Sequence, residues 1–157
     1  MRRRLFLAAL AATGAASVAS ALAADERLLR VWRDPSCGCC TGWVDHMRAA
    51  GFRVEDNLVA SPAPVRRMLG IPSDLLSCHA ATVDGYALEG HVPAEAVRRL
   101  LAERPAGVRG LAVPAMPTGS PGMEIPSEPD DTYDVVAFDD GGGGHRVFMR
   151  FRGGRAI

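Results

Sequence analysis

Three of the four cysteines of this chain lie within four consecutive residues, Cys37-Gly38-Cys39-Cys40. The preceding segment, Leu28 to Trp32, is apolar and predicts a short buried strand, which Asp34-Pro35-Ser36 ends. From Cys40 to Ala50 the apolar residues recur at helical spacing, so a helix is expected there. The cysteines therefore fall at a strand-to-helix junction, where free backbone N–H groups stabilise thiolates.

The next segments continue the alternation of strands and helices. Phe52 to Val59 predicts a strand, and a helix is expected to begin at Pro62. Ala81 to Leu88 predicts a hairpin turning at Asp84-Gly85, and Pro93 to Arg104 predicts a further helix. The order β-α-β-α-β-β-α is that of thioredoxins and glutaredoxins, so we expect an α/β fold with a thioredoxin-like mixed sheet.

Two further segments follow this predicted unit. Pro105 to Pro129 is rich in Pro and Gly and shows no helical or strand period, so a long loop is expected. Its apolar residues favour docking against the domain. Tyr133 to Arg152 holds two strand-like runs around the four glycines 141–144, which predicts a C-terminal hairpin extension.

The first residues have the features of an export signal. Arg2 to Arg4 precede an Ala-rich apolar stretch, and Ala21-Leu22-Ala23 fits a cleavage site. We expect residues 1–23 to be a signal peptide, residues 24–157 to form a single metal-binding domain, and the mature protein to be periplasmic. The apolar stretch is short, so no permanent membrane anchor is expected. Arg3-Arg4-Leu5-Phe6-Leu7 resembles a twin-arginine signal, and ordinary Sec export remains open.

Size and charge narrow the function classes. The 157 residues suffice for one compact domain. The chain has 18 basic and 18 acidic residues and no basic patch, so nothing in it favours a nucleic-acid partner.

The cysteine spacing separates several chemistries. Two structural disulfides are the ordinary expectation in an oxidising compartment, but a cluster this tight would constrain little chain. Cys37 and Cys40 alone form a C-x-x-C pair suited to thiol–disulfide exchange. Cys39 is unnecessary for dithiol chemistry and invites misplaced disulfides. Several soft thiolates close together favour Cu(I) instead, with zinc as a further alternative.

Geometry favours more than one copper ion. Adjacent cysteines do not easily direct both sulfurs to one tetrahedral ion, so bridging between several ions is more natural. Four thiolates would balance four Cu(I) ions and leave a neutral cluster that is less costly to bury. Cys78 is expected beside the N-terminus of the first helix, where thioredoxins place their cis-proline, and so to complete the site.

Other soft or imidazole ligands are secondary candidates, namely His79, His91, Met116 and Met123. The alternatives are that His91 caps a helix or braces the long loop, and that the methionines anchor that loop. Glu124 is expected to accept a hydrogen bond in the loop. His46 is expected at the edge of the core, and His145 in solvent.

Three long motifs, CGCCTGW, GIPSDLLSCHAATVDGYALEGHVP and GLAVPAMPTGSPGME, resemble the CopG-like family over about Val31 to Phe151. The resemblance implies a periplasmic, thioredoxin-like protein of copper resistance with a cysteine-bridged copper cluster that interconverts Cu(I) and Cu(II). By position it implies Cys37, Cys39, Cys40 and Cys78 as ligands. Ala80 and Ala115 stand where Thr and Gly are expected.

The sequence therefore predicts a copper-binding resistance protein that holds several Cu(I) ions and relays copper to efflux or chaperone proteins of the envelope. A thiol–disulfide oxidoreductase using Cys37 and Cys40, with Cys78 as resolving partner, remains an alternative. A zinc-binding structural module is the third. Whether the protein turns over as an enzyme is left open.

Overall fold

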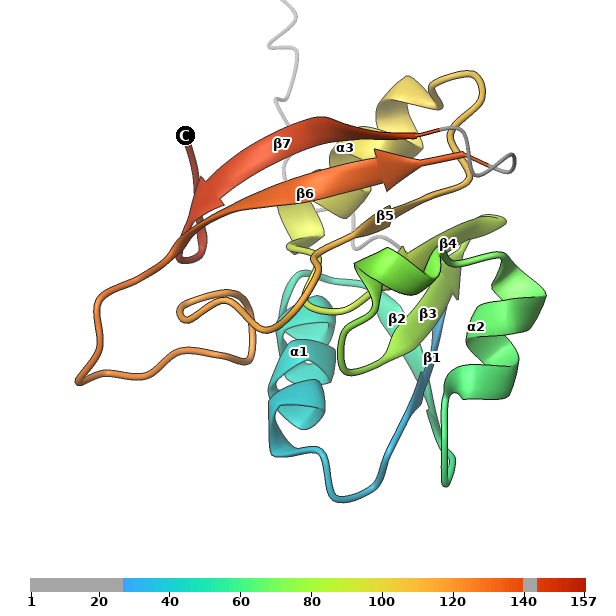
Figure 1. The fold of residues 1–157 in the computed structure, drawn as a ribbon. Helices are drawn as coiled ribbons and strands as arrows, with labels where there is room; N and C mark the ends of the chain where they lie inside the picture. Colours follow the sequence, from blue (N-terminus) through green and yellow to red (C-terminus); the bar gives the residue numbers. More distant parts are fainter. Residues whose placement is uncertain (1–26, 140–143) are drawn as a thin grey trace, which may run out of the picture.

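The computed structural model describes residues 27–139 and 144–157. The predicted signal peptide, residues 1–23, and most of the tetraglycine segment lie outside this range. Within it, none of the helices is both long and apolar enough to span a membrane. Figure 1 shows helices packed against a sheet that runs through the whole described part.

That sheet is mixed and has eight strands in the order β2-β1-β3-β4-β5-β6-β7-β8. Strand β1 pairs in parallel with β2, and β4 pairs in parallel with β5, whereas the other neighbours are antiparallel. The strands are β1 (Leu28–Arg33), β2 (Arg53–Leu58), β3 (Ala80–Val83), β4 (Tyr86–Glu89), β5 (Gly110–Ala112), β6 (Thr132–Phe138), β7 (His145–Arg152) and β8 (Arg155–Ala156).

Three α-helices and one 3₁₀ turn connect the described strands. They are α1 (Gly38–Ala49), α2 (Ala63–Leu69), α3 (Ala94–Glu103) and the 3₁₀ turn η1 (Ser73–Leu75). Helices α1 and α3 contribute to the larger core, whereas Val65 and Leu69 of α2 pack against a separate, smaller one. Neighbouring residues of one strand alternate between the two cores, as Ala80 and Ala81 do, so the cores lie on opposite faces of the sheet.

The predicted elements from β1 to α3 are present in the predicted order, with small shifts at their ends. Helix α1 begins at Gly38, two residues earlier than expected, and α2 begins at Ala63. The hairpin turns at Asp84 and Gly85, whose φ angles of 48° and 84° suit a tight two-residue connection.

The segment predicted as one long loop contains a strand. Gly110–Ala112 forms β5, which is wholly buried and pairs with both β4 and β6. Three residues are too few to show an alternating period, which is why the sequence did not reveal it. As a result, the C-terminal hairpin extends the main sheet through β5 instead of standing apart from it.

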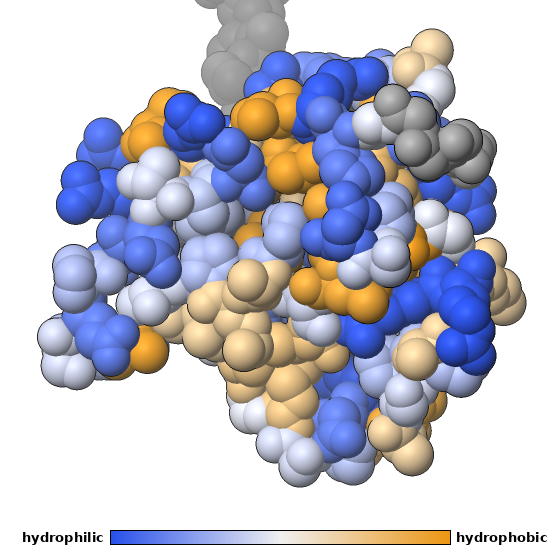
Figure 2. All heavy atoms as spheres, in the orientation of Figure 1, coloured by the Kyte–Doolittle hydropathy of each residue, from blue (hydrophilic) through white to orange (hydrophobic). Residues whose placement is uncertain are grey.

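The surface carries only scattered apolar side chains on the face drawn in Figure 2, where they form small patches among hydrophilic residues. Exposed large apolar residues include Leu58, Met68, Met116 and Val147. Single exposed apolar residues are common and need no functional explanation.

Candidate metal centre

The first three cysteines lie at the N-terminal end of α1. Cys37 occupies the N-cap position with an extended backbone, and Cys39 and Cys40 follow in the first turn. The backbone N–H of Cys37 donates to the carbonyl oxygen of Asp34, at 3.2 Å, so a tight turn leads from β1 into the helix. The first turn carries no acidic residue and no side-chain cap, so its free N–H groups favour electron-rich sulfur.

Cys78 reaches the same place from the segment between η1 and β3. The ligand atoms of Cys37, Cys39, Cys40 and Cys78 all lie within 4.8 Å of one another. In the described part of the chain, this is the sole group of three or more His, Cys, Asp or Glu residues so arranged. The structure thus brings together the four cysteines that the sequence singled out.

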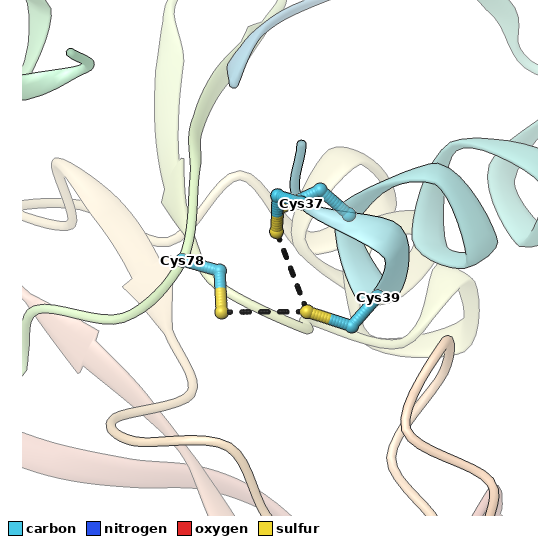
Figure 3. A group of neighbouring side chains, drawn as sticks. Cys37, Cys39 and Cys78 are labelled. Carbon is cyan, nitrogen blue, oxygen red and sulfur yellow. Dashed lines mark hydrogen bonds between the residues drawn. A yellow bond between two sulfur atoms is a disulfide. The ribbon is translucent and has the colours of Figure 1, made fainter. Parts of the chain in front are cut away.

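Figure 3 shows how the sulfur of Cys39 lies between two others. It is 3.4 Å from the sulfur of Cys37 and 3.6 Å from that of Cys78. Cys37 and Cys40 are joined by a disulfide in this structure, with 5.3 Å between their Cα atoms, which leaves Cys39 and Cys78 as free thiols. The C-x-x-C pair therefore has disulfide-forming geometry as well as a place in the sulfur group.

Burial divides the four residues. Cys40 is fully buried, whereas Cys37, Cys39 and Cys78 are half-buried and open to solvent on one side. Burial raises the pKa of the Cys78 thiol to about 12, and the hydrogen bond that this thiol donates to Cys39 and the negative charge of Cys39 act in the same direction. Without metal this thiol is neutral at ordinary pH, and a bound metal ion would replace its proton.

The two histidines predicted as secondary ligands lie outside the sulfur group. His79 is fully buried, with its ring centroid 4.3 Å from that of Trp43 and 5.2 Å from that of His91. Neither ring nitrogen of His79 has a hydrogen-bond partner within the described structure, nor does Nε2 of His91. Burial lowers the pKa of both histidines, so both rings are neutral imidazoles, the form that binds metals.

The long loop packs against the first turn of α1. Nδ1 of His91 lies 2.9 Å from the carbonyl oxygen of Pro121, so His91 braces the loop, one of the roles predicted for it. A Cβ on Gly122 would approach the carbonyl oxygen of Cys39 to 2.4 Å, which shows how closely the two segments meet. Glu124 accepts a hydrogen bond from the N–H of Gly122, as predicted.

The two loop methionines differ in position. Met123 is half-buried and follows Gly122, the residue that contacts Cys39. Met116 is 52% exposed. The remaining histidines lie as predicted in general terms: His46 is at the core edge, where Nε2 accepts a hydrogen bond from the N–H of Ala94, and His145 is exposed and pairs with Asp74.

Sequence reasoning missed one buried ion pair beside the site, between Arg66 and Glu89. Arg66 and Glu89 are 23 residues apart in the sequence. Arg66 is followed by a second arginine, and Glu89 is followed by a glycine, so the sequence around neither residue pointed to the other. A glutamate at the end of a predicted strand is usually exposed, so no pattern distinguished it.

Comparison with known proteins identifies the family. A family model described as a protein of unknown function, DUF411, matches residues 75–123, which include Cys78 and most of the long loop. No curated protein matches the sequence.

Two solved structures match closely. One, described as copper resistance protein copG, Form 2, is 39% identical and covers 81% of this chain and 99% of its own, with a TM-score of 0.74. The other, described as Form 1 of the same protein, is 40% identical and covers 82% of this chain and 100% of its own, with a TM-score of 0.74. Because the match spans most of both chains at this level of identity, the chain belongs to the CopG family of copper resistance proteins.

Proposed function

We propose that this protein acts in copper resistance by binding copper at Cys37, Cys39, Cys40 and Cys78. The observation that carries the proposal is the convergence of four sulfurs, from two distant segments, to within 4.8 Å of one another. Soft thiolate ligands at this density favour soft metal ions such as Cu(I). The names of the similar solved structures, both copper resistance proteins, point to the same metal.

We propose further that the site holds several Cu(I) ions bridged by cysteine sulfur and supports interconversion of Cu(I) and Cu(II). The short spacing of Cys39 to both Cys37 and Cys78 favours bridging sulfur over separate terminal ligands. The four negative charges of the cysteine thiolates would balance four Cu(I) ions. In this proposal His79, His91, Met116 and Met123 are secondary candidates, of which Met116 is the most exposed.

The cellular setting is also part of the proposal. Residues 1–23 act as a signal peptide, and residues 24–157 form one thioredoxin-like domain in the periplasm. The element order from β1 to α3 and the strand order β2-β1-β3-β4 at one end of the sheet support the thioredoxin-like assignment. Copper is then relayed to efflux or chaperone proteins of the envelope.

Anaerobic titration of the reduced protein with Cu(I), with thiols counted in parallel, tests the central part. Several Cu(I) ions should bind per chain, and Cys39→Ser should lower that number because Cys39 lies between two other sulfurs. Ser36→Ala, at the exposed turn before the cluster, is the control and should leave it unchanged. A plateau at one ion that survives Cys39→Ser would refute the bridged site.

A second candidate function is thiol–disulfide exchange. It is favoured by the Cys37–Cys40 disulfide, in which Cys37 is accessible and Cys40 is buried. An accessible first cysteine suits attack by an external thiol. Under this alternative, Cys39→Ser keeps dithiol reductase activity, whereas Cys37→Ser abolishes it; measured reduction of a disulfide substrate by both variants decides.

A further inference from the structure

The fourth cysteine depends on a buried ion pair for its position. Glu89, the last residue of β4, has a fully buried side chain, and Arg66 of α2 is 14% exposed. The two form a bidentate pair, with Nε of Arg66 donating to Oε2 of Glu89 at 3.0 Å and Nη2 donating to Oε1 at 2.7 Å. Such forked pairs fix the relative orientation of both side chains.

The ion pair forms hydrogen bonds with Ser77, the residue immediately before Cys78. Nη2 of Arg66 also donates to the carbonyl oxygen of Ser77, at 2.6 Å, and the N–H of Ser77 donates to Oε1 of Glu89, at 2.7 Å. Both backbone polar groups of Ser77 are therefore bound by the same ion pair. This closed network leaves the peptide before Cys78 little freedom to rotate or shift.

The residue after Cys78 is held from the same strand end. The N–H of Gly90 donates to the carbonyl oxygen of His79 at 2.9 Å. Gly90 has a φ of 70°, and a Cβ there would approach the side chain of Ser77 to 2.6 Å. Glu89 and Gly90 thus fix both neighbours of Cys78, which is the sole member of the sulfur group from outside residues 37–40.

Stability alone does not account for a carboxylate buried this completely. The desolvation of two charges often exceeds their attraction, and replacing such a pair by apolar residues is frequently neutral or stabilising. Helix α2 also packs through Val65 and Leu69, so the pair is not its sole attachment. What apolar residues would not reproduce is the set of hydrogen bonds to Ser77.

We propose that Arg66 and Glu89 are positioning residues that hold Cys78 at the distance from Cys39 that a shared copper site requires. This inference rests on the proposed function for its biological purpose. Its physical content, the placement of one sulfur relative to another, does not depend on copper and can be measured without it.

The test uses the full chain with Cys37→Ser and Cys40→Ser, which leaves Cys39 and Cys78 as the two thiols. The equilibrium constant for the Cys39–Cys78 disulfide is measured in glutathione buffers and reports the effective concentration of one thiol near the other. Glu89→Gln should lower it by about tenfold or more, because an amide nitrogen replaces one oxygen of a carboxylate that accepts hydrogen bonds from three N–H groups.

A matched control exists at the edge of the sheet formed by β2 and β1. Arg33 and Asp56 form an equally bidentate pair, with side chains 9% and 17% exposed, between β1 and β2. The bonds described for this pair do not involve Ser77 or Cys78; Nη1 of Arg33 also donates to the carbonyl oxygen of Asp34 at 3.4 Å, and Asp56→Asn does not remove that donor. Asp56→Asn should therefore change the disulfide equilibrium by less than about twofold while weakening stability comparably.

A second variant allows the same test if Glu89→Gln does not fold. The double change Arg66→Leu and Glu89→Leu leaves no unpaired buried charge and should fold, yet it should show the same loss of disulfide formation. If either folded variant keeps the equilibrium within about twofold of its parent, the pair is merely structural and the inference is wrong. If the four-cysteine protein binds no Cu(I), the proposed function fails, but this equilibrium still decides the positioning role.

Discussion

At the scale of single residues, the four cysteines have different parts in the site. Cys37 and Cys40 have the geometry of a disulfide, whereas Cys39 lies between Cys37 and Cys78 at 3.4 and 3.6 Å. Disulfide formation and metal binding compete for the same sulfurs, since a disulfide sulfur is no longer a thiolate ligand. Copper binding by all four cysteines therefore requires the reduced protein.

Ala115 shows how a single departure from the family motif affects the backbone. It has a φ of 60°, in the left-handed region that favours glycine, and glycine is the residue expected there from the motif. Its carbonyl accepts a hydrogen bond from the Ser77 side chain, so the conformation is held in place by the segment before Cys78.

Ala115→Gly should stabilise the protein. A left-handed alanine costs roughly 1–2 kcal/mol, and the greater freedom of glycine in the unfolded chain removes about half of the gain, which leaves about 0.5–1 kcal/mol. Urea unfolding of the metal-free protein measures it. Ala106→Gly, an exposed alanine without positive φ, is the control and should instead lose stability. Equal losses in both variants would contradict the strain assigned to Ala115.

At the scale of elements, the site depends on close packing between α1 and the long loop. A Cβ on Gly42 would lie 2.9 Å from Cα of Gly122, and Gly122 itself has a φ of 87°. Glycine in mid-helix is usually unfavourable, so its presence here is explained by this contact. The loop thereby covers the turn that carries Cys39.

Gly42→Ala should push the loop away from α1 and destabilise the protein by about 1–3 kcal/mol, as overpacking does. Gly38→Ala, in the same helix, is the matched control because nothing lies within 4 Å of its added Cβ. Thermal unfolding measures both. The packing interpretation fails if the two variants have the same unfolding temperature.

Helices α1 and α3 are joined by a titratable contact. Nε2 of His46 accepts a hydrogen bond from the N–H of Ala94 at 3.1 Å, at the start of α3. A protonated ring has no acceptor, and burial lowers the pKa of His46 below its ordinary value of 6.5. In the unfolded chain His46 takes up a proton near pH 6.5, whereas in the folded chain it does so only at lower pH.

His46 therefore contributes stability that is present above pH 6.5 and is lost as the pH falls through its lowered pKa. His46→Gln keeps an acceptor for Ala94 but does not titrate. On going from pH 7.5 to 5, the free energy of unfolding should fall further in the wild type than in this variant, measured by urea unfolding without metal. Parallel pH profiles would show that His46 does not contribute.

At the scale of the whole molecule, the sequence predicted the local elements better than their assembly. The apolar spacing in Leu28 to Trp32 and after Cys40 predicted β1 and α1, the elements on either side of the first cysteines. Asp84-Gly85 predicted the hairpin of β3 and β4. These signals are local, because turn chemistry and helical period depend on near neighbours. The convergence of Cys78 on Cys39 followed from the element order.

The features missed are those that depend on distant partners. Gly110–Ala112 becomes a strand only because β4 and β6 lie on either side of it. Glu89 is buried because Arg66, from another element, neutralises it. Neither partner can be inferred from periodicity, so the continuous eight-stranded sheet and the fixing of Ser77 emerge only from the fold.

X-ray absorption at the copper edge of the reduced, Cu(I)-loaded wild-type protein tests the central proposal most directly. A cysteine-bridged site predicts a first shell of sulfur neighbours and, beyond it, a copper–copper contribution, both weakened in Cys39→Ser. Copper surrounded chiefly by nitrogen or oxygen, or by sulfur with no copper neighbour, would contradict a bridged cluster at Cys37, Cys39, Cys40 and Cys78.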